Sequence, residues 1–448
     1  MRTFAHQSMF TNGNLALAIA PALTPQGIVT DPTFFKGFAT EPQVLARGLL
    51  VLADITATRY FNYMPLVLRD PILSAQGDML RAECFSACNG VYARLDLLKS
   101  GFDGKIGLGT TNVDIGIELR AALMHIKQKD KMHLNIGDIG LMVSHFEKPS
   151  QDSKITQVKN KVHERPVEMP DRWVRALGNS AEIHRGMKPV FSVNAIHAQA
   201  FIATLPPPTG KNQATWLVPS PKGIKLMARR SGKAAYVSGL HRLSALKRVM
   251  TNIKGMTFYM PDEPGASMIE VELTGMRITL SLTADAQHGY SGEGALLTAL
   301  AKEDVLEDVE AISSMLSFEA ALNEQKMAKL WGMDDGRMQT ALTHLAVSGK
   351  LGFDVHENVY FHRELPDDPN RILKDNPRLV SARKLIEFIE KSGENQRTIR
   401  SKDVEYIVHL SSDKDIQKAR CSCTWYLNHM NKRGPCKHIL AVQLKEGL

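Results

Sequence analysis

The segment RCSCTWYLNHMNKRGPCKHIL, residues 420–440, decides how the C-terminal part of the chain folds. It places four potential metal ligands in the order Cys-x-Cys-x12-Cys-x-His: Cys421, Cys423, Cys436 and His438. Three thiolates and one imidazole form a complete tetrahedral set for zinc and leave no position for a catalytic water. The spacing therefore predicts one structural zinc ion, with His429 in the intervening loop as a competing ligand.

The residues around these ligands predict a ββα arrangement over residues 395–448. Val404, Tyr406 and Val408 alternate with other residues as in a strand, and residues 416–421 can return as its partner after a turn at 411–415. The apolar run 439–442 indicates a helix. A unit of this size has few large apolar side chains, so we expect zinc to supply much of its folding free energy.

Residues 300–366 predict a winged helix, with three helices followed by a hairpin at 351–362. Asn323 is expected to cap the second helix and Gly332 to end it, and Asp334 or Asp335 can cap the third, which should stop at Gly349. The apolar positions with helical spacing are Val305, Val309, Ile312, Leu316, Met327, Leu330, Trp331, Met338, Leu342 and Leu345.

The charge of this region argues against DNA recognition by its third helix. Residues 318–365 hold seven acids against five bases, a net charge of −2. We therefore expect a structural or protein-docking role, with DNA contact through Arg337, Gln339 and His344 as the alternative.

Residues 1–290 predict a mixed α and β region, so the fold class of the whole chain is a multi-domain α+β. A helix is expected at 42–53 and glycine-centred hairpins at 133–143, 216–226 and 269–282. Helix-like stretches that include residues 171–173 and 241–243 follow the first two hairpins, through either an internal duplication or chance. A polar connector at 367–376 and a helix at 381–391 should link this part of the chain to the zinc module.

Composition places the chain among globular proteins, with 448 residues of which 44% are hydrophobic and 23% charged. Its apolar stretches fall far short of the roughly 20 residues that cross a bilayer, so we expect no membrane segment. The N-terminus lacks a convincing secretory signal. Five cysteines are too few for a disulfide scaffold, which favours a cytoplasmic location.

The net charge of +8 is concentrated in one stretch. Residues 183–261 contain twelve Lys and Arg and no Asp or Glu, among them Arg229 and Arg230, which leaves 8 − 12 = −4 for the rest. Such a stretch would attract an anionic partner such as DNA or RNA. The alternative interpretation is a solvated surface without a specific partner. Its intervening apolar residues read as a core face rather than a stacking platform: Leu226, Tyr236, Leu243, Leu246 and Val249.

The zinc module carries a second basic excess, with ten bases against five acids in residues 395–448. Lys432, Arg433 and Lys437 lie near Trp425 and Tyr426 in sequence. Basic and aromatic side chains together are typical of surfaces that hold single-stranded nucleic acid. The alternative is that the aromatics pack over the zinc site and the cations offset the thiolate charge.

The ligand pattern and its strand-then-helix context resemble the SWIM-type zinc finger, and this likeness implies Cys421, Cys423, Cys436 and His438 as the zinc ligands. The wider sequence is similar to bacterial SWIM proteins encoded beside a MoxR-type AAA+ ATPase and a von Willebrand factor A protein. The stretches that carry this likeness are GTTNVD (109–114), PDRW (170–173), GYSGEGA (289–295), YFHRELP (360–366) and RGPCKH (433–438). Thr424 stands where the family often has proline. The resemblance implies a binding module rather than a reaction.

Other candidates for chemistry favour structural interpretations. Cys84 and Cys88 have no histidine nearby in sequence, residues 107–111 lack the lysine of a phosphate loop, and His288 and Glu293 flank a glycine-rich turn. We therefore expect a non-enzymatic, zinc-dependent adaptor for protein partners. The alternative is a DNA- or RNA-binding protein that uses the zinc finger and the basic middle region.

Overall fold

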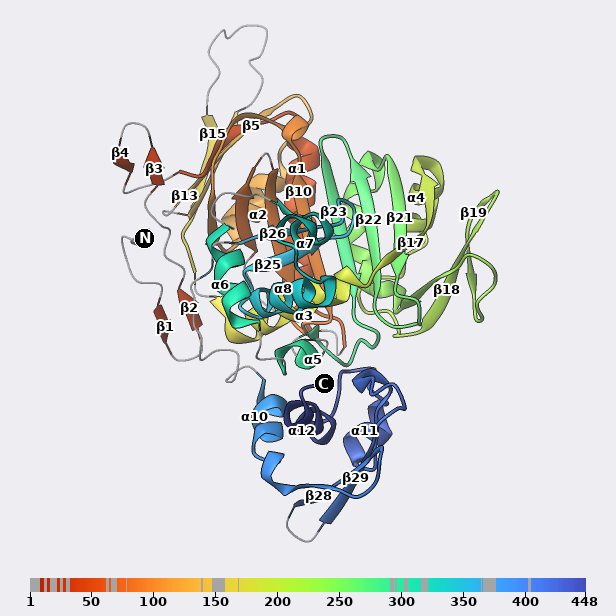
Figure 1. The fold of residues 1–448 in the computed structure, drawn as a ribbon. Coiled ribbons are helices and arrows are strands. Elements are labelled where there is room, and N and C mark those ends of the chain that lie inside the picture. Colours follow the sequence, from red (N-terminus) through yellow and green to blue (C-terminus); the bar gives the residue numbers. More distant parts are fainter. Residues whose placement is uncertain are drawn as a thin grey trace, which may run out of the picture. The chain divides into compact units, whose positions relative to one another are not determined.

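The computed structural model contains helices and antiparallel sheets throughout (Figure 1). It describes residues 33–61, 71–77, 79–137, 140–146, 158–167, 169–290, 305–315, 321–363, 376–401 and 404–448, with short pieces at 9–11, 14–16, 22–24, 27–29, 64–65, 294, 296–301 and 365.

The chain divides into two compact units. Unit 1 comprises residues 1–173, 186–290 and 363–366, and unit 2 comprises residues 174–185, 291–362 and 367–448. Residues 300–362 of the predicted winged-helix region and the zinc module thus lie in the same unit, together with most of one helix from the earlier part of the chain, whereas residues 363–366 belong to unit 1.

Unit 1 is built on an eight-stranded antiparallel sheet. Its strand order is β12 (Gly109–Asn112), β8 (Ile72–Gln76), β9 (Met79–Phe85), β10 (Val91–Leu97), β23 (Met276–Leu282), β22 (Ser267–Leu273), β21 (Gly255–Met260) and β17 (Lys188–Asn194). The pairing of β10 with β23, from Val91 opposite Leu282 to Leu97 opposite Met276, joins strands from the two ends of the unit. Helix α1 (Pro42–Thr56) packs against β9, β10 and the 3-10 helix η2 (Leu240–Asn252).

Two smaller sheets complete the main body of unit 1. One has the order β11 (Phe102–Ile106), β5 (Phe35–Ala39), β13 (Lys131–Gly137), β14 (Gly140–Phe146) and β15 (Val158–Glu164), and the other β19 (Gly223–Met227), β18 (Ala214–Ser220) and β20 (Ala235–Ser238). The predicted hairpins are therefore present as β13–β14, β18–β19 and β22–β23. The remaining elements are α2 (Ile117–Met124), α4 (Ala195–Ala203), η1 (Lys99–Gly101), β1 (Met9–Thr11), β2 (Asn14–Ala16), β3 (Ala22–Thr24), β4 (Gly27–Val29), β6 (Thr58–Arg59), β7 (Met64–Pro65) and β16 (Met169–Pro170).

One order of elements occurs twice in unit 1. Apart from the two-residue strands β6 and β7, a strand, a helix and three strands run from β5 through α1 to β10 and again from β17 through α4 to β20. A helix and three further strands follow each run, after β11 and β12 in the first case and directly in the second. In this order η2 corresponds to α2, whereas α3 (Asp171–Arg185) stands outside it. The helix-like stretches at 171–173 and 241–243 therefore do not occupy equivalent places.

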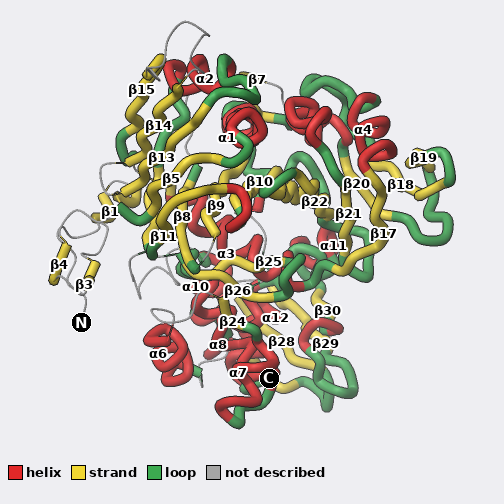
Figure 2. The backbone as a smooth tube through the Cα atoms, turned by 90° about the horizontal axis from the view of Figure 1, so that it is seen from above, coloured by secondary structure: helices red, strands yellow, loops and turns green. Residues whose placement is uncertain are grey.

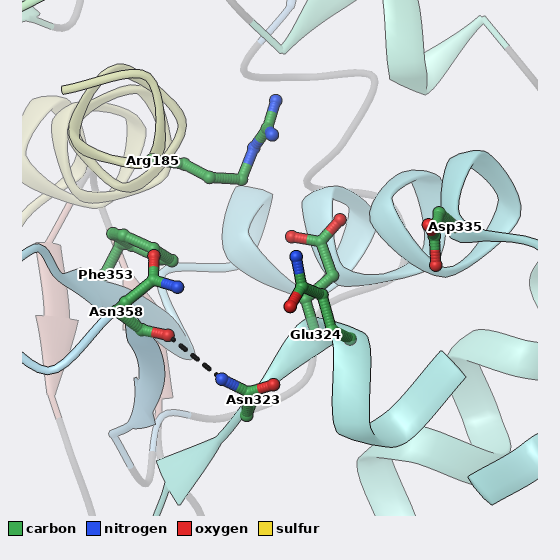
Figure 3. A pocket seen from close by; sticks show the side chains of 7 residues that line it. Arg185, Asn323, Glu324, Asp335, Phe353 and Asn358 are labelled. Atoms are coloured by element: carbon green, nitrogen blue, oxygen red, sulfur yellow. Dashed lines mark hydrogen bonds between the residues drawn. The ribbon is translucent and has the colours of Figure 1, made fainter. Parts of the chain in front are cut away.

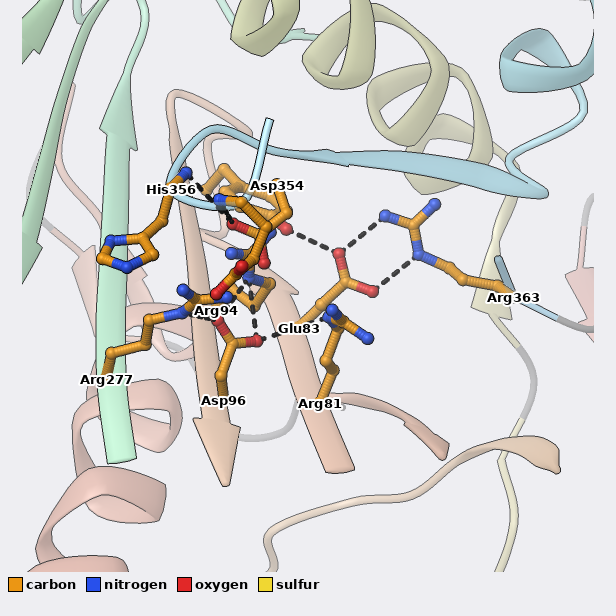
Figure 4. A network of polar contacts seen from close by, with 10 residues as sticks. Arg81, Glu83, Arg94, Asp96, Arg277, Asp354, His356 and Arg363 are labelled. Atoms are coloured by element: carbon orange, nitrogen blue, oxygen red, sulfur yellow. Dashed lines mark hydrogen bonds and ion pairs between the residues drawn. The ribbon is translucent and has the colours of Figure 1, made fainter. Parts of the chain in front are cut away.

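A buried ion network lies against β9, β10 and β23 (Figure 4). The Arg363 guanidinium donates two hydrogen bonds of 2.6 Å to the Glu83 carboxylate, and the Tyr92 hydroxyl donates a third. Asp96 accepts from Arg277 at 2.7 Å. Burial raises the pKa of Glu83, but the charge and hydrogen bonds of Arg363 outweigh that effect, so the net shift is downward. The carboxylate is thus held ionised inside the fold.

The first half of unit 2 contains α5 (Leu297–Leu300), α6 (Leu306–Met315), β24 (Ala321–Leu322), α7 (Glu324–Trp331), α8 (Asp335–Val347), β25 (Leu351–Asp354) and β26 (Val359–His362). Asn323 and Asp334 cap α7 and α8 by accepting hydrogen bonds from the amides of Lys326 and Arg337. The helices and the hairpin occur at the expected places, with β24 as a third strand beside β26. The winged-helix assignment itself remains a prediction.

The core of this half follows the expected spacing with one exception. Met338, Leu342 and Leu345 are buried, but Leu330 is 73% exposed, so its predicted place on the core face is wrong. Met327, which was predicted together with Leu330 on this short helix, is buried as expected. Leu316 lies outside the described residues.

The second half of unit 2 contains α10 (Pro377–Arg383), η4 (Ile386–Phe388), β27 (Ile389–Lys391), β28 (Gln396–Ser401), β29 (Val404–His409), η5 (Ile416–Lys418), β30 (Arg420–Cys421), α11 (Thr424–His429) and α12 (Lys437–Glu446). The predicted helix at 381–391 is wrong, because Ile389 pairs with Ile399 in a sheet. The predicted partner strand at 416–421 shortens to β30, and β28 is the longer partner of β29. The connector at 367–376 lies outside the described residues, apart from Asn376.

Candidate metal centre and basic surface

The four predicted zinc ligands come together in the zinc module, residues 395–448. Cys421 ends β30, Cys423 and Cys436 stand immediately before α11 and α12, and His438 lies in the first turn of α12. Their ligand atoms all lie within 4.8 Å of one another, and Cys421 Sγ is 3.7 Å from His438 Nδ1. All four side chains are buried. Three thiolates and one imidazole nitrogen gathered around one point match a tetrahedral zinc site.

Backbone amides donate hydrogen bonds to two of the ligand sulfurs. The Cys423 sulfur accepts a hydrogen bond from the amide of Tyr426, and the Cys436 sulfur accepts one from the amide of Ile439, both at 3.5 Å. These amides belong to helix N-termini, which favour negative charge. Hydrogen bonds from the neighbouring Cys421 and Cys436 thiols lower the pKa of Cys423. A bound divalent cation favours the thiolate form of all three.

The histidines of the loop have separate roles. Tyr406 stacks on the His438 ring with centroids 4.0 Å apart, which fixes the orientation of the ligand. His429 instead contacts the Trp425 ring at 4.4 Å and is not part of the ligand cluster. The competing assignment of His429 therefore finds no support in the geometry.

Trp425 is half-buried against the core of the zinc module and lies near two cations. The Arg378 guanidinium lies 4.4 Å from the ring centroid and that of Arg433 lies 5.7 Å from it. Arg378 also donates to the carbonyls of Arg433 and Pro435, at 3.0 and 3.2 Å. These contacts favour the alternative in which the loop aromatics pack within the module. Lys432 and Lys437 are exposed.

The structure sorts the twelve bases of residues 183–261 into two groups. Four are buried or paired: Arg242 is fully buried, Arg185 pairs with Glu182, Lys188 with Asp262 and Arg248 with Asp54. Burial lowers the pKa of Arg242 to about 10, and its guanidinium donates to the carbonyls of Ser238, Gly90 and Thr283. Arg242 therefore adds no charge to the surface.

Six of the other bases are exposed on β18, β19, β20 and their loops, residues 211–238, which we term the basic sheet: Lys211, Lys222, Lys225, Arg229, Arg230 and Lys233. Lys247 and Lys254 are exposed elsewhere. The expectation of a core face holds for Leu243, Leu246 and Val249, which are buried, but it is wrong for Leu226, which is 51% exposed, and for Tyr236, which is half-buried. Leu226 lies on the edge strand β19, and Tyr236 lies on the opposite face of the sheet, directly beside Trp216.

A cavity of about 230 Å³ lies in unit 2 beside α7, α8 and the β25–β26 hairpin (Figure 3). Burial raises the pKa of Glu324, against the opposing charge of Arg185. The Asn323 amide donates to the carbonyl of Asn358 at 3.4 Å. The described lining residues include no nucleophile paired with a base, so they do not form a recognisable catalytic arrangement.

The remaining candidates agree with structural roles where they are described. Cys84 is buried and burial raises its pKa, which opposes the reactive thiolate form. Gly109–Asn112 form strand β12, so residues 107–111 are a turn followed by a strand rather than a turn alone. His288 is partly exposed and lies 3.5 Å from Asp285, and Glu293 lies outside the described residues.

The chain resembles known proteins locally, in one family, and only weakly in the fold of a longer part. No curated protein matches the chain. Proliferating cellular nuclear antigen from Entamoeba histolytica shows 12% identity and a TM-score of 0.36, covering 56% of this chain and 99% of its own. The PCNA2-PCNA3 complex from Sulfolobus tokodaii shows 9% identity and a TM-score of 0.38, covering 56% and 98%. These likenesses carry no argument about function.

Within the described residues, no helix is long and apolar enough to span a membrane. The SWIM zinc finger family matches residues 406–445, the part of the chain that holds all four ligands. The zinc module is therefore a SWIM zinc finger that binds one structural zinc ion.

Proposed function

We propose that this protein is a cytoplasmic, non-enzymatic adaptor whose SWIM zinc finger presents a binding surface to protein partners. The observation that supports this most is the closed ligand set. All four ligands are buried protein side chains, which leaves the metal no position for water or substrate. Zinc then stabilises the fold of the module and takes no part in a reaction.

The zinc loop offers a surface suited to a protein partner. Leu427 and Met430 are 61% and 65% exposed and lie three residues apart, beside the exposed base Lys432. Exposed apolar side chains with a charged rim are typical of protein interfaces. Leu427 lies in α11, which begins directly after the zinc ligand Cys423, and Met430 follows the end of this helix, so the metal site anchors the segment.

The partners we propose are a MoxR-type AAA+ ATPase and a von Willebrand factor A protein, as the resemblance of the wider sequence implies. We further propose that residues 300–366 form a winged helix with a structural or docking role. Asp334 and Asp335 at the start of α8 would repel DNA phosphates.

Mixing the purified, zinc-loaded chain with a purified MoxR-type ATPase and von Willebrand factor A protein from one gene neighbourhood tests this proposal. We expect a complex in size-exclusion chromatography that survives nuclease treatment and is lost with Leu427→Asp/Met430→Asp. The matched control Ile117→Asp/Met124→Asp changes two similarly exposed apolar side chains on α2, outside both the zinc loop and residues 300–366. No complex, or one that Leu427→Asp/Met430→Asp leaves intact, would refute the proposed docking.

A second candidate function is nucleic-acid binding, favoured by the six exposed bases of the basic sheet with no acid between residues 183 and 261. Phosphate contacts make affinity fall steeply with salt. Fluorescence anisotropy of labelled DNA and RNA at about 50 and 200 mM salt tests this candidate, since several contacts should cost orders of magnitude over that range.

A further inference from the structure

One face of the basic sheet carries a row of large side chains that crosses all three strands. Trp216 on β18 lies opposite Met227 on β19 and opposite Tyr236 on β20. Residues that are directly opposite in an antiparallel sheet point to the same face. The Trp216 and Tyr236 rings contact each other edge to face with centroids 5.4 Å apart. The sequence places these residues far enough apart that only the strand register reveals the row.

This row lies on the uncovered face of the sheet. Leu217, Ala235 and Val237 alternate with the row along the strands and are buried, so they form the covered face of the sheet. Helix α4 contacts the edge strand β19 (Figure 2). Met227 is 42% exposed, and Trp216 and Tyr236 are half-buried. The Trp216 and Tyr236 side chains thus lie on a sheet whose other face is largely buried, and both remain partly exposed to solvent.

Cations surround the row without an acid among them. Lys225 lies two residues before Met227 on the same face of β19, and it is exposed. Arg230, in the loop after β19, places its guanidinium 5.6 Å from the centroid of the Trp216 ring. Arg229 and Lys233 are exposed in the same loop. The charge of this face complements a polyanion.

We propose that this face binds a single strand of nucleic acid, with bases stacked on Trp216 and Tyr236 and with phosphates held by Lys225, Arg229 and Arg230. The proposal rests on the nucleic-acid candidate above and gives it a place and a preferred form. A base that enters takes the position of Arg230 over the indole ring, which releases the guanidinium to a phosphate.

A single strand fits this face better than a duplex. Adjacent strands of a sheet lie about 4.8 Å apart, so the row spans about 10 Å, enough for two or three unstacked bases. In a duplex the base faces are already stacked and cannot reach the rings. Stacking on aromatic side chains is the main contact of proteins that hold single strands with little sequence preference.

The test measures binding by the full, zinc-loaded chain to a fluorescein-labelled 20-nucleotide oligo(dT), an oligo(U) and a 20-base-pair duplex. We expect the single strands to bind at least about tenfold more tightly than the duplex. Trp216→Ala should weaken single-strand binding by about tenfold or more, as loss of one stacked base does. Trp216→Phe should restore most of that loss, because phenylalanine also stacks.

A charge-matched pair of double variants locates the phosphate contacts. Lys225→Ala/Arg230→Ala should reduce the slope of log K against log salt by about 1.4, since each phosphate contact to a single strand contributes about 0.7. Lys247→Ala/Lys254→Ala removes the same charge from exposed positions outside the basic sheet and should leave the slope nearly unchanged. Thermal melts of each variant establish that unit 1 remains folded.

Three results would overturn the proposal, and they are distinguishable. If the unmodified chain binds no nucleic acid at about 50 mM salt, the nucleic-acid candidate fails with it. If binding is strong but depends on Lys432 and Lys437 instead of Trp216, Lys225 and Arg230, the candidate stands and this placement is wrong. If the duplex binds as tightly as the single strands, the stacking role is wrong.

Discussion

Two tryptophans lie beside arginines, Trp425 in the zinc module and Trp216 on the basic sheet, but their surroundings differ. Trp425 lies within range of two guanidinium groups and a histidine ring, and Arg378 is itself fixed by two backbone carbonyls. Trp216 has Arg230, which is exposed, as its cation. The same residue types thus form a structural cluster in one region and an accessible surface in the other.

The difference shows what decides between the two roles. A cation fixed by further hydrogen bonds has little freedom to exchange its aromatic partner for a ligand, whereas an exposed one can do so at small cost. The regions also differ in what supports them. The zinc module combines a metal site with an apolar core, whereas unit 1 combines an apolar core with a buried ion network.

Removal of zinc should have the largest effect and should be confined to unit 2. Chelation, or the variant Cys436→Ala, is expected to unfold residues 395–448, because structural zinc sites of this kind contribute about 10–16 kcal/mol at neutral pH. Leu440 shares one core cluster with Leu297 and Leu379, so α5 and α10 should also lose protection. Hydrogen exchange measures both effects, with Cys88→Ala as the matched cysteine control.

That prediction fails if protection of residues 395–448 persists after chelation. Loss of protection around Trp216 in the same experiment would contradict the independence of the two regions.

Arg363→Ala should have the next largest effect and should act on unit 1. It leaves the buried Glu83 carboxylate without its strongest partner, and breaking such a pair costs about 3–5 kcal/mol. Urea denaturation at pH 7 measures the loss, and Arg363→Lys, which keeps the charge but not the bidentate geometry, should lose less. A change under about 1 kcal/mol would contradict the role assigned to this pair.

The same pair predicts how stability depends on pH. The pKa of Glu83 is lowered in the folded state, so its contribution is present above the pKa of an unfolded glutamate and is lost as the pH falls through the folded value. In Arg363→Ala, the Arg363 guanidinium no longer offsets the effect of burial on Glu83, so the pKa of Glu83 in the folded state rises. Acid unfolding of this variant should therefore begin at a higher pH than that of the unmodified chain, as fluorescence-monitored pH titrations can measure.

Substitution of the two tryptophans should give the smallest effects on stability and the clearest contrast. Trp425→Ala should cost about 2–3 kcal/mol, because the ring packs against the core cluster of the zinc module. Trp216→Ala should cost about 1 kcal/mol, the scale of a cross-strand pair. Differential scanning calorimetry measures both, with the two phenylalanine variants as controls. Equal costs would argue that both rings are structural.

The zinc site could be predicted from the sequence because its ligands are local. Cys421 and Cys423 are two residues apart, and so are Cys436 and His438. The first pair follows a predicted strand and the second pair begins a predicted helix, so the four ligands need only the intervening loop to bring them together. The helix caps at Asn323 and Asp334 are local in the same sense. The α11 helix within the loop was missed, because its six residues carry no apolar period.

Features that depend on distant residues could not be predicted. Glu83 and Arg363 are 280 positions apart, and no local pattern signals their pairing. Residues 385–389 have apolar spacing that suits a helix, but the pairing of Ile389 with Ile399 makes the end of that segment a strand. Alternation along 216–226 predicted a hairpin without indicating which face would be covered. The row through Trp216 therefore became visible only with the strand register.

Quenching of intrinsic tryptophan fluorescence by oligo(dT) tests the central contrast most directly, because a stacked base quenches the indole that it contacts. The unmodified chain should be quenched, Trp425→Phe should be quenched to the same extent, and Trp216→Phe should lose the quenching while it retains binding. Quenching that persists in Trp216→Phe and disappears in Trp425→Phe would place the nucleic acid on the zinc module and contradict the account.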